Sequence, residues 1–117
     1  MLGSRFTPEG TSWIAEVSDE VEAVTVFTRF SEHNCEMSIA TNGKKRWATR
    51  GYLRACFRYP FVQCKKTRVT VVIEDDNVAS IRLCRLLGYV DEGTLKGWFG
   101  PKDGVLMRMT FKECRWL

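Results

Sequence analysis

Residues Asp75–Gly93 read D-D-N-V-A-S-I-R-L-C-R-L-L-G-Y-V-D-E-G and follow the apolar run Val69–Ile73. An apolar run, a polar turn and then a periodic segment predict a strand that leads into a helix. Either Asp76 or Asn77 can cap that helix, because a short side-chain oxygen accepts a backbone N–H of the first turn. Gly88 supplies the left-handed residue that commonly ends a helix, and a second strand follows it.

The predicted helix has two distinct faces. Four apolar side chains recur at the spacing of a stripe that faces a core, namely Ala79, Leu83, Leu86 and Leu87. Asn77, Ser80 and Cys84 are spaced i, i+3 and i+7, so they share a different face. Small polar groups beside a buried stripe indicate that a ligand is held against this second face.

This stretch resembles the late signature of the GNAT superfamily of N-acetyltransferases. From Asn77 to Gly93 the chain reads N-x-x-S-x-x-L-x-x-x-L-G-Y-x-x-E-G, where the family usually has N-x-x-[AS]-x-x-L-Y-x-K-x-G-F-x-x-E-G. The polar turn Pro101–Gly104 and the apolar strand Val105–Met109 are similar too. The resemblance covers residues 69–117, and it is to a short, phage-like member that is trimmed at its N-terminus.

The remaining periodic and alternating segments predict the order β-β-β-α-β-α-β-β. The predicted strands are Ser12–Ser18, Ala23–Phe30, Cys35–Ala40, Arg68–Ile73, Val90–Lys96 and Val105–Phe111. The predicted helices are Ala48–Tyr59 and the segment that begins at Asp76. In the first helix the expected inward residues are Tyr52, Leu53, Cys56 and Phe57, and the expected outward ones are Arg50, Arg54 and Arg58.

This order belongs to the α/β (α+β) class, with a mixed central sheet and flanking helices. The resemblance implies the GNAT-like acyl-CoA N-acyltransferase fold. Only Met1–Gly10 precede the first predicted hairpin, so we expect the fold to lack its usual first strand and first helices.

Length and composition predict one GNAT-like domain over residues 1–117. An apolar content of 44% and a charged content of 27% are ordinary for a globular chain. The sequence has neither an apolar run long enough to span a membrane nor a secretory signal, so we expect a cytoplasmic protein without a membrane partner. The five cysteines include no C-x-x-C pair, which predicts reduced thiols and no metal site.

The charges divide unevenly along the chain. Residues 1–40 carry seven acidic side chains against two arginines, whereas residues 41–72 carry nine Lys and Arg and no acid. Such a split predicts an anionic ligand near the middle of the chain.

The basic segment Thr41–Arg50 leads from a predicted strand into a predicted helix. A helix N-terminus offers free N–H groups and a partial positive charge, which suits a pyrophosphate. The resemblance implies acetyl-CoA here, bound in the family by a [QR]-x-x-G-x-[GA] loop whose motif positions correspond to Lys45, Ala48 and Arg50. The implied cofactor-binding residues are Ile39, Ala40, Thr41, Lys45, Arg46, Trp47, Ala48, Thr49, Arg50, Asn77 and Ser80. A solvated basic helix face is the alternative.

Two residues match the family's catalytic positions. Glu36 lies where many members place a general base, and Cys84 lies where many have a tyrosine that protonates the leaving thiolate. Each has a plainer interpretation, as an ordinary strand glutamate and as a buried, inert cysteine. Asn77 can likewise be a helix cap alone.

The resemblance implies a transferase that moves acetyl from acetyl-CoA to a primary amine by direct attack. The acceptor is a small-molecule or protein amine, and a homodimer could complete its groove. One alternative is a non-catalytic GNAT-like protein that binds CoA or a protein partner. Another is a nucleic-acid-binding module that uses a stripe of arginines (Arg46, Arg50, Arg54 and Arg58), against which the modest net charge of +4 argues.

Overall fold

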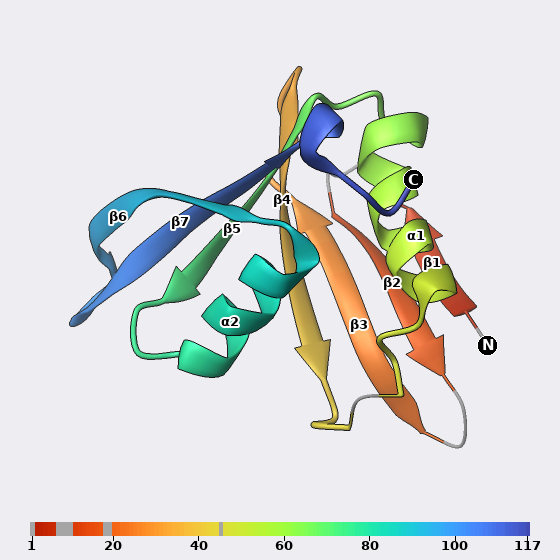
Figure 1. The fold of residues 1–117 in the computed structure, drawn as a ribbon, viewed down its shortest axis with the longest axis horizontal. Coiled ribbons are helices and arrows are strands. Elements are labelled where there is room, and N and C mark those ends of the chain that lie inside the picture. The colour runs from red at the N-terminus through yellow and green to blue at the C-terminus, as the bar shows by residue number, and fades with distance from the viewer. Residues whose placement is uncertain (1, 7–10, 18–19, 45) are drawn as a thin grey trace.

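A computed structural model describes residues 2–6, 11–17, 20–44 and 46–117, which form one mixed sheet with its helices (Figure 1). The described strands are β1 (Leu2–Phe6), β2 (Ser12–Val17), β3 (Val21–Thr28), β4 (Asn34–Thr41), β5 (Arg68–Glu74), β6 (Val90–Phe99) and β7 (Lys102–Thr110). Their spatial order is β1-β2-β3-β4-β5-β7-β6. Neighbouring strands run antiparallel except β4 and β5, which are parallel. The predicted α+β class is confirmed, and so is the predicted order of elements from β2 onward.

The expectation that no strand precedes the first hairpin is wrong. Strand β1 pairs with β2 in an antiparallel ladder that sets Gly3 opposite Ala15. The short segment before β2 can still form a strand, because two antiparallel strands need only a short connection. A strand followed by two helices would need many more residues. Among the described residues, no helix lies between β1 and β2.

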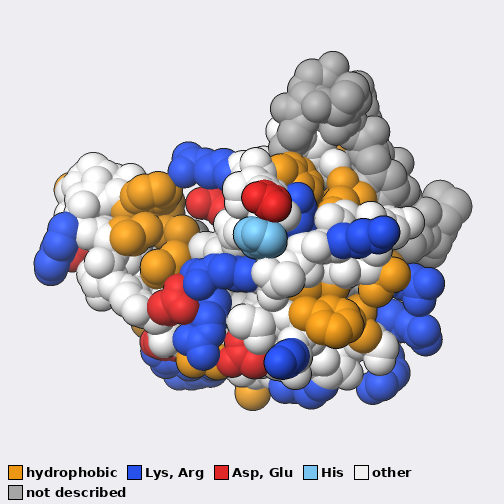
Figure 2. Space-filling model, turned by 90° about the horizontal axis from the view of Figure 1, so that it is seen from above, with side chains coloured by type: hydrophobic (Ala, Val, Ile, Leu, Met, Phe, Trp, Pro, Cys, Tyr) orange, Lys and Arg blue, Asp and Glu red, His pale blue; other side chains and the backbone are white. Residues whose placement is uncertain are grey.

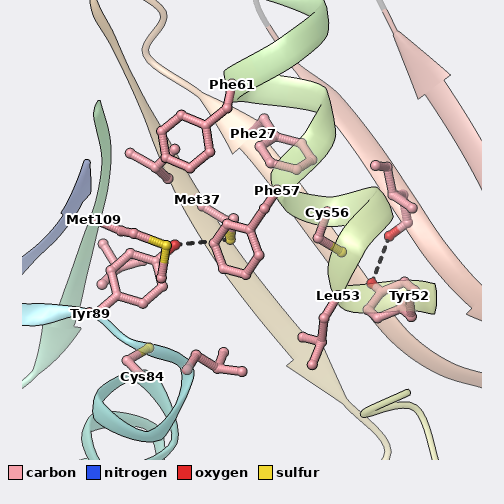
Figure 3. Close-up of a cluster of buried hydrophobic side chains, with 14 of the residues drawn as sticks. Phe27, Met37, Tyr52, Leu53, Cys56, Phe57, Phe61, Cys84, Tyr89 and Met109 are labelled. Carbon is pink, nitrogen blue, oxygen red and sulfur yellow. Dashed lines mark hydrogen bonds between the residues drawn. The ribbon is translucent and has the colours of Figure 1, made fainter. Parts of the chain in front are cut away.

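The described helices are α1 (Arg50–Arg58) and α2 (Val78–Leu87), with a π-type turn at Tyr59–Gln63 and a 3-10 turn at Phe111–Glu113. Both helices pack on the same face of the sheet, because one buried cluster contains Phe57 of α1, Cys84 of α2 and Met109 of β7 (Figure 3). We call this the helix face and the opposite one the bare face, which no described helix covers. No helix of the described residues is long and apolar enough to cross a membrane.

Helix α1 is held to the sheet by a buried polar contact as well as by apolar packing. All four residues that the pattern turned inward are buried, and the three arginines are exposed. The Tyr52 hydroxyl donates to the carbonyl of Ile14 at 3.1 Å and lies 2.7 Å from Thr25 Oγ1. Burial raises the pKa of Tyr52 far above its ordinary value, so the hydroxyl stays neutral and joins α1 to β2 and β3.

The segment predicted to be helical from Asp76 forms α2 from Val78, with Asn77, one of the two expected caps, directly before it and the expected Gly88 after it. The Asn77 side-chain oxygen accepts from the Ser80 backbone N–H at 3.2 Å, and Gly88 ends the helix at φ 113°.

The predicted apolar stripe of α2 is partly wrong. The buried residues are Ile81, Cys84 and Leu87, whereas Leu86 is 67% exposed and Ala79 is exposed too. The reason lies just after the helix, where Tyr89 is buried and its hydroxyl lies 3.2 Å from Met37 Sδ. This contact fixes the rotation of α2, so that Leu87, Cys84 and Ile81, which are spaced three residues apart, face the sheet.

Gly88 and Gly51 provide a matched test of the backbone argument. A Cβ on Gly88 would lie 3.3 Å from Arg115 Nη1 and would occupy a left-handed conformation, whereas Gly51 is helical with open space around it. We expect Gly88→Ala to lower the free energy of unfolding by about 1–2 kcal/mol, and Gly51→Ala to raise it by roughly 0.5–1 kcal/mol. Urea denaturation measures both, and a Gly88→Ala variant as stable as the unmodified protein would contradict the account.

Candidate functional site

The two parallel strands form a fork. Strands β4 and β5 pair at only three positions, Asn34↔Arg68, Cys35↔Val69 and Glu36↔Thr70, and then diverge (Figure 1). On their outer edges β4 stays paired with β3 as far as Thr41, and β5 with β7 as far as Glu74. In the described chain, residues 37–41 and 71–74 therefore have no ladder partner across the fork.

A cavity of about 230 Å³ lies in this fork. Its walls are Met37, Ser38 and Ile39 of β4, Val71, Val72, Ile73 and Glu74 of β5, Asn77, Ser80, Leu83 and Cys84 of the α2 segment, and Tyr89 and Phe99. Successive side chains of a strand point to opposite faces of the sheet. Because consecutive residues of both strands line it, the cavity passes between the strands from the helix face to the bare face.

The predicted polar face of α2 forms one wall of the cavity, with Asn77, Ser80 and Cys84 all lining it. The cap uses only the side-chain oxygen of Asn77. Its amide Nδ2 therefore remains as a donor, so capping and ligand binding do not compete for the same atom.

The α2 side of the cavity includes one thiol, that of Cys84. Its side chain is buried, and burial raises the pKa of the thiol to about 11. The group therefore stays protonated at neutral pH, which matches a buried and unreactive cysteine.

Part of the predicted basic loop is neutralised. Arg46 Nη2 lies 2.5 Å from the carboxylate of Glu22, which is buried, and Lys44 Nζ lies 2.6 Å from Glu20. Lys45 lies outside the described residues. The uneven charge along the sequence thus reflects, in part, ion pairs between this loop and the start of β3.

The end of the loop has structural roles that the sequence did not reveal. Trp47 is buried with its ring edge-on to Tyr52, so it packs in the core. The Thr49 hydroxyl caps α1 by accepting from the Tyr52 N–H at 3.1 Å. Arg50 begins α1, is exposed and forms no ion pair among the described residues. Of the other predicted cofactor residues, Ile39 lines the cavity, while Ala40, Thr41 and Ala48 are exposed.

Glu36 lies at the last paired position before the fork, on the bare face. Its carboxylate is 3.5 Å from Arg29 Nε, and the Arg29 guanidinium carbon lies 5.3 Å from the centre of the Trp98 ring. Sequence reasoning missed Arg29, Trp98 and Phe99, because no local spacing joins them to Glu36. His33 is exposed beside Glu32, away from the residues that line the cavity.

Seen from the end where β4 and β5 begin, Lys and Arg side chains are interspersed with acidic and apolar ones (Figure 2). This view shows no single broad basic surface. In the described residues, no group of three or more His, Cys, Asp or Glu could hold a metal ion.

Neither a protein-family model nor a curated protein matches the chain. Solved structures match it well. A ribosomal-protein-S5-alanine acetyltransferase from Vibrio fischeri has a TM-score of 0.72 at 16% identity, over 93% of this chain and 65% of its own. A GNAT-family acetyltransferase from Bacillus anthracis has a TM-score of 0.70 at 20% identity, over 89% and 68%. The Campylobacter jejuni N-acetyltransferase PseH in complex with acetyl coenzyme A has a TM-score of 0.69 at 12% identity, over 87% of this chain and 69% of its own.

The chain spans about two thirds of the length of the solved structures it matches. At these low identities the likeness concerns the fold. The chain has the fold of the GNAT N-acetyltransferases.

Proposed function

We propose that the protein is an N-acetyltransferase that binds acetyl-CoA with its thioester in the fork between β4 and β5. The observation that carries this proposal is the cavity that passes through the sheet where the two parallel strands separate. Support also comes from the fold shared with N-acetyltransferases, one of which is a complex with acetyl-CoA.

The residues of the fork suit the pantetheine arm of that cofactor. The arm contains amide groups, and an extended amide chain can pair with a strand edge as an added strand does. The unpaired backbone of residues 37–41 and 71–74 offers two such edges. Asn77 and Ser80, at the start of α2, line the same space and carry side-chain hydrogen-bonding groups.

The diphosphate would lie at the start of α1. This N-terminus has free N–H groups and a partial positive charge, and Arg50 adds an exposed, unpaired cation there. Arg46 contributes less than the sequence suggested, because Glu22 already pairs with it.

When bound, acetyl-CoA would supply a thioester carbonyl for attack by an amine, with a C–N bond formed and the C–S bond broken, and the leaving thiolate would take its proton from solvent. Glu36 lies on the bare face beside the residues where the cavity emerges, and its carboxylate accepts the proton that the amine loses. Cys84 lines the cavity and does not donate a proton to the leaving group. Its thiol, with a pKa of about 11, is a weaker acid than an ordinary thiol, whose pKa is about 8.5.

Arg50 and Arg58 test the position of the diphosphate, because both are exposed arginines of α1 at opposite ends of the helix. Acetyl-CoA at about 100 times its Kd stabilises a folded protein by about 2.7 kcal/mol, which raises the melting temperature by several degrees. We expect Arg50→Glu to remove most of this rise and the control Arg58→Glu to retain it. Equal rises in the two variants would place the phosphates elsewhere, and no rise in the unmodified protein would overturn the proposal.

Glu36→Gln tests the proton acceptor without changing the size of the side chain. We expect kcat with n-butylamine as the acceptor to fall by about 10²–10⁴-fold, the usual contribution of a general base. The melting temperature and its rise with acetyl-CoA should stay unchanged, since Glu36 does not line the cavity. A variant that keeps full activity would exclude Glu36 from proton transfer.

Cys84→Ala tests the role of the thiol. Because burial keeps the pKa of Cys84 at about 11, the thiol does not titrate between pH 7 and pH 9 and adds no step to the pH–rate profile. We expect kcat of the alanine variant to change by only a few-fold, far less than the roughly 10²–10⁴-fold of a lost general acid. A hundredfold loss in a variant that still binds acetyl-CoA would restore Cys84 as a proton donor.

A further inference from the structure

We propose that Trp98 and Glu36 form a binding site for the protonated acceptor amine, and that the Arg29 guanidinium occupies this site until the amine displaces it. This inference rests on the proposed function and extends it by assigning the acceptor a class, that of aliphatic ammonium ions.

The arrangement around Arg29 already shows how a cation is bound there. The guanidinium carbon lies 5.3 Å from the centre of the Trp98 ring, and Nε lies 3.5 Å from a Glu36 oxygen. An aromatic face together with one carboxylate is the combination that recognises organic cations. The Arg29 guanidinium thus makes the two contacts that we assign to the ammonium group of the acceptor.

The site lies beside the opening of the cavity on the bare face. Ser38 and Val72 line the cavity and, by strand alternation, point to that face. Glu36 comes two residues before Ser38, while Trp98 packs next to Val72 over Gly104. Phe99, the neighbour of Trp98, itself lines the cavity. A cation held here is therefore next to the place proposed for the thioester.

Gly104 allows Trp98 to lie against the sheet. A Cβ at this position would come within 2.7 Å of Val72 Cγ1 and 3.2 Å of Trp98 Cβ. A larger residue would push the indole away from the strands, so Gly104 positions Trp98.

Arg29 is suited to leave. Its side chain is 63% exposed, and exposed ion pairs are weak. It also has a positive φ of 51°, which a side-chain-bearing residue adopts at some cost.

The other charged side chains on this side of the sheet already have partners of opposite charge. Arg68 pairs with Glu92, and Arg108 pairs with Glu92 and Glu113. Lys102 pairs with Glu74 and Asp76. Glu74 also lines the cavity, but Lys102 already pairs with it, so Glu36 is the carboxylate that loses its cation when Arg29 moves.

Binding can be tested without cofactor or turnover by titrating tetramethylammonium, a cation that cannot be acetylated, and following the Trp98 indole N–H by NMR. We expect the resonance to shift on titration. Replacing Arg29 by Asn, which tolerates a positive φ, should tighten binding about two- to fivefold, the size of an exposed cation–π contact. Glu36→Gln should weaken it by a similar factor, and Arg29→Lys should behave like the unmodified protein.

A matched control is Lys66, whose ammonium lies 5.9 Å from the centre of the Phe30 ring. Lys66→Gln should leave tetramethylammonium binding unchanged. The proposal is overturned if the Trp98 resonance does not respond, if Arg29→Asn fails to tighten binding, or if Lys66→Gln has the same effect as Arg29→Asn.

Turnover provides a second readout. We expect the KM for n-butylamine to fall in Arg29→Asn and to rise in Trp98→Ala and Gly104→Ala, with Trp98→Phe in between and kcat changed little. Aniline, which is uncharged at neutral pH, should show no such dependence. Tetramethylammonium binding without turnover on amines would support the cation site and overturn acetyl transfer. Turnover whose KM ignores Trp98 and Arg29 would overturn the cation site alone.

Discussion

The end of the β4–β5 ladder at Glu36↔Thr70 is the constraint on which the rest of the structure depends. A parallel pair normally satisfies its backbone groups all along its length. Here both strands go on beyond the last pair while their outer edges remain in register with β3 and β7. The sheet therefore stays continuous around an opening, and that opening becomes a cavity with strand edges for walls.

The packing around the fork keeps it open. Tyr52 ties α1 to β2 and β3, on the β4 side, while Tyr89 and the buried residues of α2 pack beside β5. The contact between the Tyr89 hydroxyl and Met37 Sδ bridges the two sides (Figure 3). Each strand is thus bound to its own half of the core, and closing the fork would require the two helices to move together.

Much of the fold could be predicted from the sequence because it depends on local periodicity. The inward residues of α1, the Asn77 cap and the Gly88 end of α2 all follow from spacing along one segment. The shared cavity face of Asn77, Ser80 and Cys84 follows in the same way. The likeness of the fold to the GNAT N-acetyltransferases was predicted from the same segment.

Features that depend on distant partners could not be predicted. The rotation of α2 about its axis is set by Tyr89 beyond its end, and the pairing of Arg46 with Glu22 joins the loop before α1 to strand β3. The assembly of Arg29, Trp98 and Glu36 joins the residue after β3 to strands β6 and β4, which share no sequence pattern. Strand β1 was missed because a strand of only five residues carries a weak alternating signal.

The most direct test of the account is amide hydrogen exchange, followed by NMR with and without saturating acetyl-CoA. The account predicts slower exchange for the amides of residues 37–41 and 71–74 that point into the fork, with little change for amides at the C-terminal end of α1. Protection confined to other parts of the chain, with the fork exchanging as fast as before, would contradict the claim that the separated strands hold the cofactor.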